Sequence, residues 1–346
     1  MTTPLVHVLV INWNGREHLT DCFASLLASD YPAVEFVLVD NASTDDSIAL
    51  VERDFGADPR VAILPLATNR GWSGGNNAGI ARAREMGASY IFLLNNDTAV
   101  APDCIRLLVQ GMERRPDCGA LAPRMLLFDS PTHLNSVGLE LSLIGSAWDR
   151  GIGQLDGPAW HEEVPVAGVC GGACFLRTRA LDDTTLLPEE FGIYLDDLDL
   201  CLQLWRGGHA VWTCPAAAVR HKFSATMGVG DGARKKYYLN TRNRLWLVAR
   251  QFPLGKAWRF LPMVLLGEIR ALGRGMLDGA WWKLGLHLRA WIAATAYLPR
   301  AWRYRRGTST ARRDAFWFLV RTSPLFCPPL ELPPLKGRPT VQWRGE

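Results

Sequence analysis

Residues 5–14 read LVHVLVINWN, and this stretch decides the class of fold. Positions 5–11 are mostly β-branched or long aliphatic residues, which predicts a buried β-strand. The strand ends at the polar residues Asn12 and Asn14. Apolar residues then recur every three or four positions, which predicts an amphipathic helix over 16–29. A buried strand that leads directly into such a helix is the first half of a β–α unit.

The same alternation of strand and helix repeats through the first 115 residues or so. Further strands are predicted at 36–39, 61–66 and 90–94. The helices that follow them are predicted to be capped by Ser43 or Thr44, to run over 75–87, and to open at Pro102. Four alternations predict an α/β fold with a mostly parallel sheet flanked by helices.

Polar residues follow three of these strands. Because the carboxyl ends of parallel strands meet at one edge, where ligands bind, we expect the three clusters to lie together. A single polar strand end is usually a cap or a turn, but three at one edge predict a ligand site. The clusters are Asn12 with Asn14, Asp40 with Asn41, and Asn95, Asn96 and Asp97.

Residues 69–79 read NRGWSGGNNAG and contain Asn69, Gly71 and Asn76. Glycines let the backbone approach a ligand closely, and amides that open a helix can receive phosphate. A flexible loop is the alternative. The first βα turn lacks GxGxxG and the glycine-rich stretch lacks the lysine of a P-loop, which argues against a dinucleotide-binding domain and a P-loop enzyme.

Residues 192–199 read GIYLDDLD and open a helix predicted over 195–205. Acids at a helix start complement its dipole, which explains one or two of the carboxylates Asp196, Asp197 and Asp199. A further one among apolar neighbours suggests a general base. His221 follows a short strand predicted at 210–213 and is either a structural residue or a metal ligand.

The remainder of the chain is less regular. Loops are predicted from Pro123 to about residue 165, followed by a strand over 169–177. Basic and aromatic helices are predicted from 237 to about 304, and the last 25 residues contain six prolines. We therefore predict an α/β domain over 1–235, an amphipathic basic helical region over 236–321 and a Pro-rich extended tail over 322–346.

Charge is divided unevenly along the chain. Residues 234–321 contain 19 Lys and Arg against three acids, whereas residues 1–233 have a balance of −13 in a chain of net charge +4. The basic part is expected to face an anionic partner, either nucleic acid or a membrane. Its bases alternate with Leu and Trp, which favours an anionic membrane surface over nucleic acid.

The membrane prediction concerns residues 245–306. Charged residues interrupt their apolar runs, so we expect them to lie on the membrane without crossing it. The alternative is a set of helices packed against the catalytic part or a partner chain. The tryptophans expected at the headgroup level are Trp258, Trp281, Trp282, Trp291 and Trp302.

The eight cysteines are scattered without a CxxC pair. Cys170 and Cys174 are the nearest to each other, and a reduced buried pair is favoured over a zinc site. The first residues lack the pattern of a signal peptide. We therefore expect a cytoplasmic protein at the inner face of the membrane, as a monomer or a homo-oligomer.

Taken together, the polar motifs resemble the inverting family-2 glycosyltransferases with the GT-A fold, especially the bacterial rhamnosyltransferase-like branch. The motifs occur in the family's order over about 215 residues. The matching stretches are 10–14, 39–45, 69–71, 74–77, 94–97, 172–174 and 194–199, followed by His221.

The resemblance implies roles for the donor-binding residues. Asp40 would hydrogen-bond a pyrimidine base, helped by the backbone around Asn12, while Asn69 and Gly71 would lie along the ribose and phosphates. The full set expected to bind the nucleotide-sugar is Asn12, Asn14, Asp40, Asn41, Asn69, Gly71, Asn76, Asn95, Asn96 and Asp97.

The resemblance also implies a metal and a base. Asp97 matches the last acid of the family's DXD motif and would bind Mg²⁺ or Mn²⁺ with His221. Asp197 would be the catalytic base, and Asp196 would orient the acceptor or donor. The sequence departs from the motif at Asn95, where many members have the first acid, so metal affinity is expected to be weaker or to depend more on His221.

The expected reaction is metal-dependent transfer of a sugar, with inversion, to a saccharide or lipid-linked saccharide in cell-surface polysaccharide synthesis. dTDP-rhamnose is the first expectation for the donor and a UDP-linked hexose the second. A sugar-nucleotidyltransferase is the alternative enzyme, but no N-terminal glycine-rich loop with Arg and Lys precedes Arg16. A non-enzymatic protein that binds nucleic acid or a membrane is the other alternative.

Overall fold

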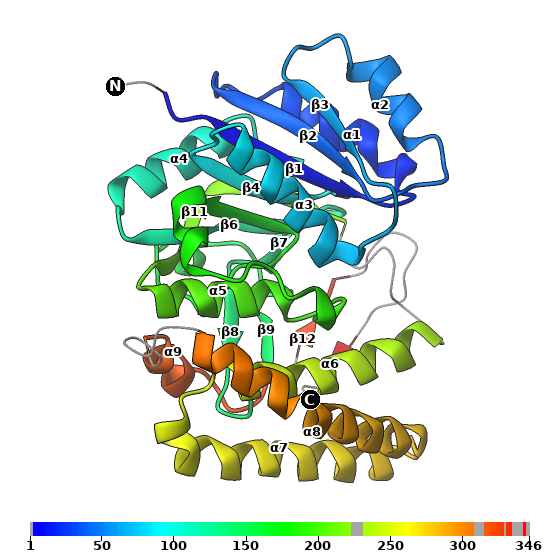
Figure 1. Cartoon of the computed structure of the whole chain (residues 1–346), viewed down its shortest axis with the longest axis vertical. Coiled ribbons are helices and arrows are strands. Elements are labelled where there is room, and N and C mark those ends of the chain that lie inside the picture. Colours follow the sequence, from blue (N-terminus) through cyan, green and yellow to red (C-terminus); the bar gives the residue numbers. More distant parts are fainter. Residues whose placement is uncertain (1–2, 223–230, 308–314, 329, 334–341, 344–346) are drawn as a thin grey trace.

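The computed structural model describes residues 3–222, 231–307, 315–328, 330–333 and 342–343. Within them, a nine-stranded sheet has the order β3-β2-β1-β4-β10-β6-β11-β5, and β7 pairs with β6. Helices cover both faces of this sheet, and a further group of helices lies below it in Figure 1.

The first four strands of the sheet are parallel, as the sequence predicts. They are β1 (Val6–Asn12), β2 (Val34–Asp40), β3 (Val61–Pro65) and β4 (Tyr90–Asn95). Their helices are α1 (Arg16–Leu27), α2 (Ser47–Phe55), α3 (Gly71–Glu85) and α4 (Cys104–Arg114). Side chains of α1, α2 and α4 pack in one core on one face of the sheet, whereas α3 packs in a second core on the other face.

Three helix starts differ from the prediction, one of them α4, which begins at Cys104 and not at Pro102. α2 begins at Ser47 with Asp46 at the cap position, because the hydroxyl of Ser43 instead accepts hydrogen bonds from Asn12 and from the backbone of Asn14. α3 begins at Gly71, four residues before the predicted start at 75.

The glycines of α3 allow it to pack closely on the sheet. A Cβ atom on Gly75 would lie 2.3 Å from Cδ1 of Ile11, and one on Gly79 would lie 2.8 Å from a methyl group of Leu9. The glycine-rich stretch is therefore a tightly packed helix and not a flexible loop.

The second half of the sheet is where the sequence prediction is least complete. Its strands are β5 (Thr98–Val100), β6 (Cys118–Leu127), β7 (Ser130–Ser136), β10 (Ala173–Arg177) and β11 (Ala210–His221). β10 lies antiparallel between β4 and β6, so the sheet is mixed and less parallel than expected. A separate hairpin, β8 (Leu139–Leu141) and β9 (Ala147–Asp149), occupies part of the segment predicted as loop.

β11 is much longer than the strand predicted at 210–213, and His221 is its last residue. The reason is a register shift between Cys214 and Ala218, which accommodates Pro215 inside the strand. Proline lacks a backbone N–H, so it is tolerated in a strand chiefly at such an irregularity.

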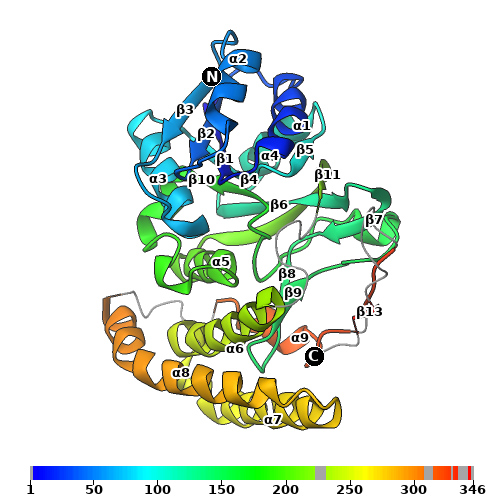
Figure 2. The ribbon, with the colours of Figure 1, turned by 90° about the vertical axis from the view of Figure 1, so that its right-hand side faces the viewer.

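The C-terminal helices pack on the part of the chain that contains the sheet. α5 (Asp196–Gly207) contacts α6 (Asp231–Gln251), and α6 in turn packs on α8 (Trp282–Gly307), while α7 (Ala257–Leu277) lies farthest from the sheet (Figures 1 and 2). The core shared with α5 includes Phe252, Phe260 and Tyr297. The predicted basic helical region is thus confirmed as helical.

The last described elements are short. α9 (Trp317–Thr322) precedes β12 (Leu330–Glu331), which pairs antiparallel with β13 (Gln342–Trp343). Much of the predicted tail, including 334–341 and 344–346, lies outside the described residues. In the part of the chain that the structure describes, every helix is too short or too polar to span a lipid bilayer.

Candidate active site

The three polar clusters at the strand ends meet at one edge of the sheet, as expected. Asn12 is paired with Asp40 across β1 and β2, and its Nδ2 donates to Oδ1 of Asp40 at 3.1 Å. Nδ2 of Asn96 donates to Oδ1 of Asn12 at 2.6 Å. Asn12 thus connects the ends of β1, β2 and β4.

Asp40 and Asn14 hold the turn that follows β2. Oδ2 of Asp40 accepts a hydrogen bond from the backbone of Ser43 at 2.9 Å, and Oδ1 of Asn14 accepts one from Thr44 at 2.7 Å. Asn12 and Asp40 are each 1% exposed, so their buried side chains support the backbone of this edge. Trp13, which is 55% exposed, presents a flat apolar surface beside it.

Asn41 connects β2 to the start of α3. Its Nδ2 donates to Oδ1 of Asn69 at 3.0 Å and to the carbonyl oxygen of Gly71 at 2.9 Å, while its Oδ1 accepts the backbone N–H of Arg70 at 2.8 Å. Gly71 has a φ of 70°, a conformation that glycine adopts without strain. The N-terminus of α3, which favours anions, is therefore fixed at the same edge.

Asn76 is buried behind the start of α3. Its side chain is 0% exposed and its amide donates to the carbonyl oxygen of Trp72 at 3.0 Å. Of the residues expected to bind the nucleotide-sugar, Asn76 therefore supports the helix from inside, because it is buried within the packing of α3.

Asp97 and His221 form a pair at the ends of two strands. Nε2 of His221 lies 3.2 Å from Oδ1 of Asp97, and Nδ1 of His221 lies 2.6 Å from Oδ1 of Asn135 on β7. Burial acts to raise the pKa of Asp97, but the hydrogen bond and charge of His221 outweigh burial and lower it. Asp97 is thus held in the ionised state.

This pair fits a divalent cation. Oδ1 of Asp97 is buried, and the partner that the structure gives it is Nε2 of His221 at 3.2 Å. A carboxylate oxygen beside an imidazole nitrogen is a donor set that Mg²⁺ or Mn²⁺ accepts. The described residues contain no cluster of three or more His, Cys, Asp or Glu side chains suited to a metal, so most ligands would have to come from substrate and water.

Asp197 lies at the first turn of α5. Its Oδ2 accepts the backbone N–H of Gly171 at 2.8 Å and its Oδ1 accepts that of Leu198 at 2.7 Å. Burial, and next the charge of Asp196, raise the pKa of Asp197 to about 7. A half-buried carboxylate with a pKa near neutrality is suited to general base catalysis.

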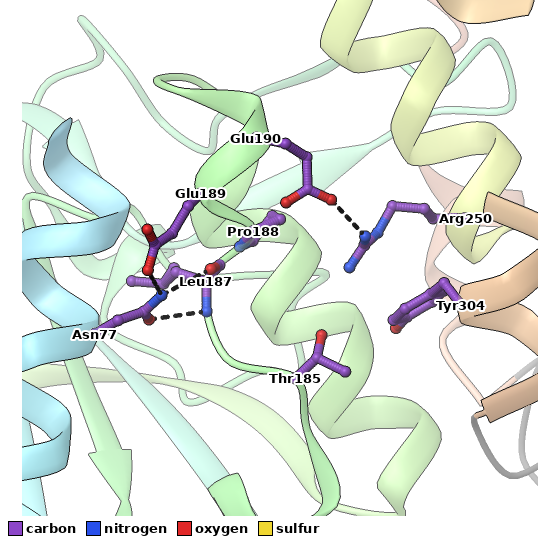
Figure 3. A pocket seen from close by; sticks show the side chains of 8 residues that line it. All are labelled: Asn77, Thr185, Leu187, Pro188, Glu189, Glu190, Arg250 and Tyr304. Atoms are coloured by element: carbon purple, nitrogen blue, oxygen red, sulfur yellow. Dashed lines mark hydrogen bonds and ion pairs between the residues drawn. The ribbon is translucent and has the colours of Figure 1, made fainter. Parts of the chain in front are cut away.

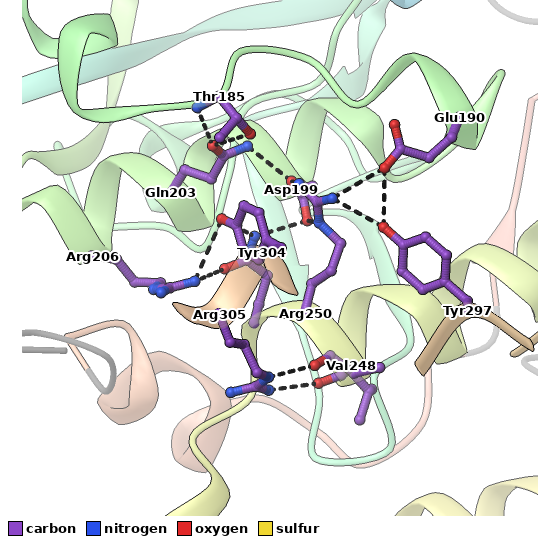
Figure 4. Close-up of polar contacts among 12 residues, drawn as sticks. Thr185, Glu190, Asp199, Gln203, Arg206, Val248, Arg250, Tyr297, Tyr304 and Arg305 are labelled. Carbon is purple, nitrogen blue, oxygen red and sulfur yellow. Dashed lines mark hydrogen bonds and ion pairs between the residues drawn. The ribbon is translucent and has the colours of Figure 1, made fainter. Parts of the chain in front are cut away.

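Asp196 and Asp199 have other partners. Asp196 accepts a hydrogen bond from the hydroxyl of Ser73 on α3, and burial raises its pKa. Asp199 is 0% exposed and pairs with Nε and Nη2 of Arg250 on α6 at 3.0 and 3.1 Å (Figure 4). Asp199, one of the three acids at this helix start, therefore belongs to a buried ion pair that stabilises the fold.

Gly171 and Gly172 bring Asp197 close to the Asp97–His221 pair. A Cβ atom on Gly171 would lie 3.3 Å from Cβ of Asp197 and 2.7 Å from the ring of Trp72. One on Gly172 would lie 3.4 Å from Cε1 of His221. The predicted base and the predicted metal ligand His221 therefore lie on either side of two consecutive glycines.

Two residues of the site were not predicted from the sequence. The indole N–H of Trp72 donates to Oδ1 of Asn95 at 2.9 Å, which explains how an amide is held where an acid is common. Asn243 on α6 is 0% exposed and donates to the carbonyl oxygens of Ile193 and Tyr194, both at 2.9 Å. The only available signal for Asn243 was a polar residue in the interior of a helix.

A cavity of about 360 Å³ lies beside this site (Figure 3). Asn77, Glu190, Arg250 and Tyr304 are among the residues that line it, and none of the predicted site residues does. Glu189, also in its lining, forms an ion pair with Arg70 at 3.0 Å, so the cavity adjoins the start of α3.

Comparison with known proteins identifies the family. The profile described as "Glycosyl transferase family 2" matches residues 7–184, just over half of the chain. The chain belongs to glycosyl transferase family 2. The family resemblance predicted from the motifs is thereby confirmed, and the protein is a glycosyltransferase, not a sugar-nucleotidyltransferase or a non-enzymatic binding protein.

A curated relative of this family-2 glycosyltransferase is N-acetylglucosaminyl-diphospho-decaprenol L-rhamnosyltransferase of Mycobacterium tuberculosis. The two are 25% identical over 250 residues, which cover 65% of this chain and 78% of the relative.

Two solved structures have a similar fold. TarS 1–349 of S. aureus in complex with UDP-GlcNAc is 15% identical, with a TM-score of 0.57 over 98% of this chain and 99% of that chain. The mannosyltransferase PcManGT of Pyrobaculum calidifontis, in complex with GDP-Man and Mn²⁺, is 16% identical, with a TM-score of 0.52 over 88% of each chain. At this identity the similarity supports the GT-A fold alone.

Proposed function

We propose that this glycosyltransferase moves a sugar, with inversion, from a nucleoside diphosphate-sugar to a hydroxyl group of a saccharide or lipid-linked saccharide in cell-surface polysaccharide synthesis. The observation that carries the proposal is Asp197, whose pKa is raised to about 7 and which lies beside Gly171, next to the Gly172 that borders His221, the partner of Asp97. A base at that place can meet an acceptor hydroxyl next to the diphosphate end of the donor.

In the proposed reaction, Asp197 takes the proton of the acceptor hydroxyl. The acceptor oxygen forms a bond to the anomeric carbon while the bond from that carbon to the diphosphate oxygen breaks, and the electron pair leaves with the nucleoside diphosphate. Attack opposite the leaving group inverts the anomeric configuration. The N–H groups of Gly171 and Leu198 keep the carboxylate of Asp197 oriented for this transfer.

The nucleotide is proposed to lie along the edge formed by β1, β2 and α3. The base would lie against the turn after β2, which the side chain of Asp40 holds in place. Exposed Trp13 offers a surface on which the base can stack. Asn69 and Gly71 would lie along the ribose and phosphates, where the N-terminus of α3 favours their charge.

A divalent metal is proposed at Asp97 and His221. Mg²⁺ or Mn²⁺ bound there would neutralise the charge that grows on the departing diphosphate. Asn95 contributes no charge, and its Oδ1 accepts from Trp72. The protein therefore offers one carboxylate and one imidazole, consistent with a metal that is shared with the substrate.

The donor sugar proposed first is rhamnose on dTDP, followed by a UDP-linked hexose. The name of the mycobacterial relative, an L-rhamnosyltransferase for a diphospho-decaprenol acceptor, supports both a rhamnose donor and a lipid-linked acceptor. Such an acceptor would place the reaction at the inner face of the cytoplasmic membrane, where we propose that the enzyme binds anionic lipid.

Donor hydrolysis across a panel of nucleotide-sugars, with Mg²⁺ and with Mn²⁺, tests the proposal. We expect one donor class to be hydrolysed slowly without acceptor, with release of the nucleoside diphosphate. Release of a nucleoside monophosphate, or no hydrolysis and no binding of any nucleotide-sugar, would contradict it.

A further inference from the structure

The outer face of α7 is apolar over its whole length. Trp258, Leu261, Leu265, Ile269 and Met276 are 71%, 54%, 59%, 59% and 50% exposed. Their spacing puts them on one side of the helix. The opposite side, with Phe260, Val264 and Glu268, is buried against the rest of the protein.

α8 and the turn before it continue this surface. Trp281, Leu284, Leu288, Ile292 and Trp302 are between 47% and 64% exposed. Both ribbon views place α7 and α8 together at the end of the molecule opposite to α2 (Figures 1 and 2). Single exposed apolar side chains are normal on a protein, but two adjacent rows of this kind mark an interaction surface.

A buried polar cluster keeps these rows facing outwards. Glu268 on α7 accepts hydrogen bonds from Arg244 on α6 and from His287 and Trp291 on α8. Arg244 also donates to the carbonyl oxygen of Ile144 in the β8–β9 turn at 3.0 Å. These contacts fix the three helices to each other and to the catalytic part. The apolar rows of α7 and α8 are therefore held in a defined position on the surface.

The charges around the surface are almost all positive. Residues 257–307 contain Glu268 and Asp278 as their acids, and Glu268 is buried. Exposed bases that flank the apolar rows include Arg259, Arg270 and Arg289. A cavity of about 440 Å³ at the end of α7 is lined by Arg270, Arg274 and Leu277 together with Gly273 and Asp278. An apolar face with a basic border matches the boundary between acyl chains and anionic headgroups.

From these observations we propose that the outer faces of α7 and α8 form a membrane-docking surface, with both helices in the plane of the bilayer surface and Arg270 and Arg274 beside lipid phosphates. This surface is the face by which the enzyme would bind the membrane. The proposal rests on the proposed function only because a lipid-linked acceptor would require the enzyme to reach the membrane.

Flotation of the full chain with phosphatidylcholine vesicles, with and without phosphatidylglycerol, tests this surface. The double substitution Leu265→Glu with Ile269→Glu puts charge on the exposed row of α7 and should lower vesicle binding at least about 100-fold. Met86→Glu, which charges an exposed apolar residue at the end of α3, is the matched control and should leave vesicle binding unchanged. Arg270→Gln should weaken binding only to vesicles that contain phosphatidylglycerol.

Donor hydrolysis in detergent-free buffer separates this proposal from the proposed function, because all of these variants should hydrolyse donor like the unaltered chain. Equal vesicle binding by the double variant would overturn the docking surface. Absence of vesicle binding by the unaltered chain would also overturn it, and a dimer of that chain that the double variant converts to a monomer would show that a second copy covers the surface.

Discussion

The side-chain amide of Asn243 donates a hydrogen bond to the carbonyl oxygen of Tyr194 at 2.9 Å. Tyr194 and Leu195 both have positive φ angles, 75° and 64°, which are unfavourable for residues with a Cβ atom. The turn that they form leads directly into Asp196 and Asp197. A residue of the C-terminal helical region therefore holds a strained turn in front of the proposed base.

Asn243→Asp should lower kcat about 100-fold while the Kd for donor changes little, because the carboxylate cannot donate to the carbonyl oxygens and the turn before Asp197 loses its support. Steady-state kinetics and calorimetric titration of donor would measure the two effects. Asn240→Asp, one turn away on the same helix, is the control and should keep kcat. A fall in thermal stability with unchanged kcat would show that Asn243 only stabilises the fold.

Asp197→Asn should lower transfer about 10²–10⁴-fold and leave donor binding intact, since the amide cannot accept the acceptor's proton. Asp196→Asn should cost less, because Asp196 accepts a hydrogen bond from Ser73 and is buried. Comparison of kcat for the two variants tests the order of the pair. A severe Asp196 variant and a mild Asp197 variant would reverse the assignment.

The pH profile of kcat offers an independent check on the base. Burial and the charge of Asp196 raise the pKa of Asp197 to about 7, so the proton-accepting form is lost as pH falls through that value. We expect kcat to rise with pH below about 7 and to level off above it. A flat profile from pH 5 to 8 would mean that the base ionises as an ordinary carboxylate and that burial and the charge of Asp196 do not raise the pKa of Asp197.

Removal of metal with EDTA should abolish transfer. Asp97→Ala should weaken binding of a nucleoside diphosphate in the presence of Mg²⁺ but much less in its absence. Asn95→Asp restores a second acid beside Asp97 and should tighten Mn²⁺ binding, by about tenfold. Titration of Mn²⁺ followed by its electron paramagnetic resonance signal would measure this, and full activity in chelator would show that protein cations replace the metal.

Asp199→Asn should destabilise the fold by about 3 kcal/mol, because it leaves the buried guanidinium of Arg250 without its closest counter-charge. Glu190, 3.1 Å from Nη1 of Arg250, compensates in part. Unfolding in denaturant would measure the change. Asp54→Asn breaks the exposed pair with Arg53 and should leave the unfolding midpoint unchanged; equal effects of the two variants would show that burial is not the cause.

The first half of the fold could be predicted because each signal was local. The apolar runs of β1, β2 and β4 are buried throughout, with only Asn95 and Glu35 partly exposed, and each strand precedes a polar residue at the same edge of the sheet. Among the later strands, β10 was predicted within 169–177 and the start of β11 at 210–213, but β5, β6 and β7 were not predicted. The antiparallel place of β10 and the full length of β11 were also missed, because β10 depends on partners far away in the sequence and β11 passes through a proline. Pairing between distant strands carries no local pattern.

The positions of the candidate residues could be predicted from motifs at strand ends and at a helix start, but not the contacts that depend on how distant elements pack. Asp97, His221 and Asp197 follow from their motifs, and the structure brings them to one region. Asp199 sits beside Asp197 in the same motif, yet its partner Arg250 comes from a helix that the sequence indicated only as basic. The role of Asn243 likewise depends on how α6 packs against the turn before α5.

The anomeric configuration of the product is the most direct test of the account. With the preferred donor, a saccharide acceptor and a divalent metal, ¹H NMR of the first product should show a glycosidic bond of inverted configuration relative to the donor, because one base at Asp197 supports a single displacement. Retention of configuration would require two displacements or attack from the leaving-group side, and it would contradict Asp197 as the base of an inverting transfer.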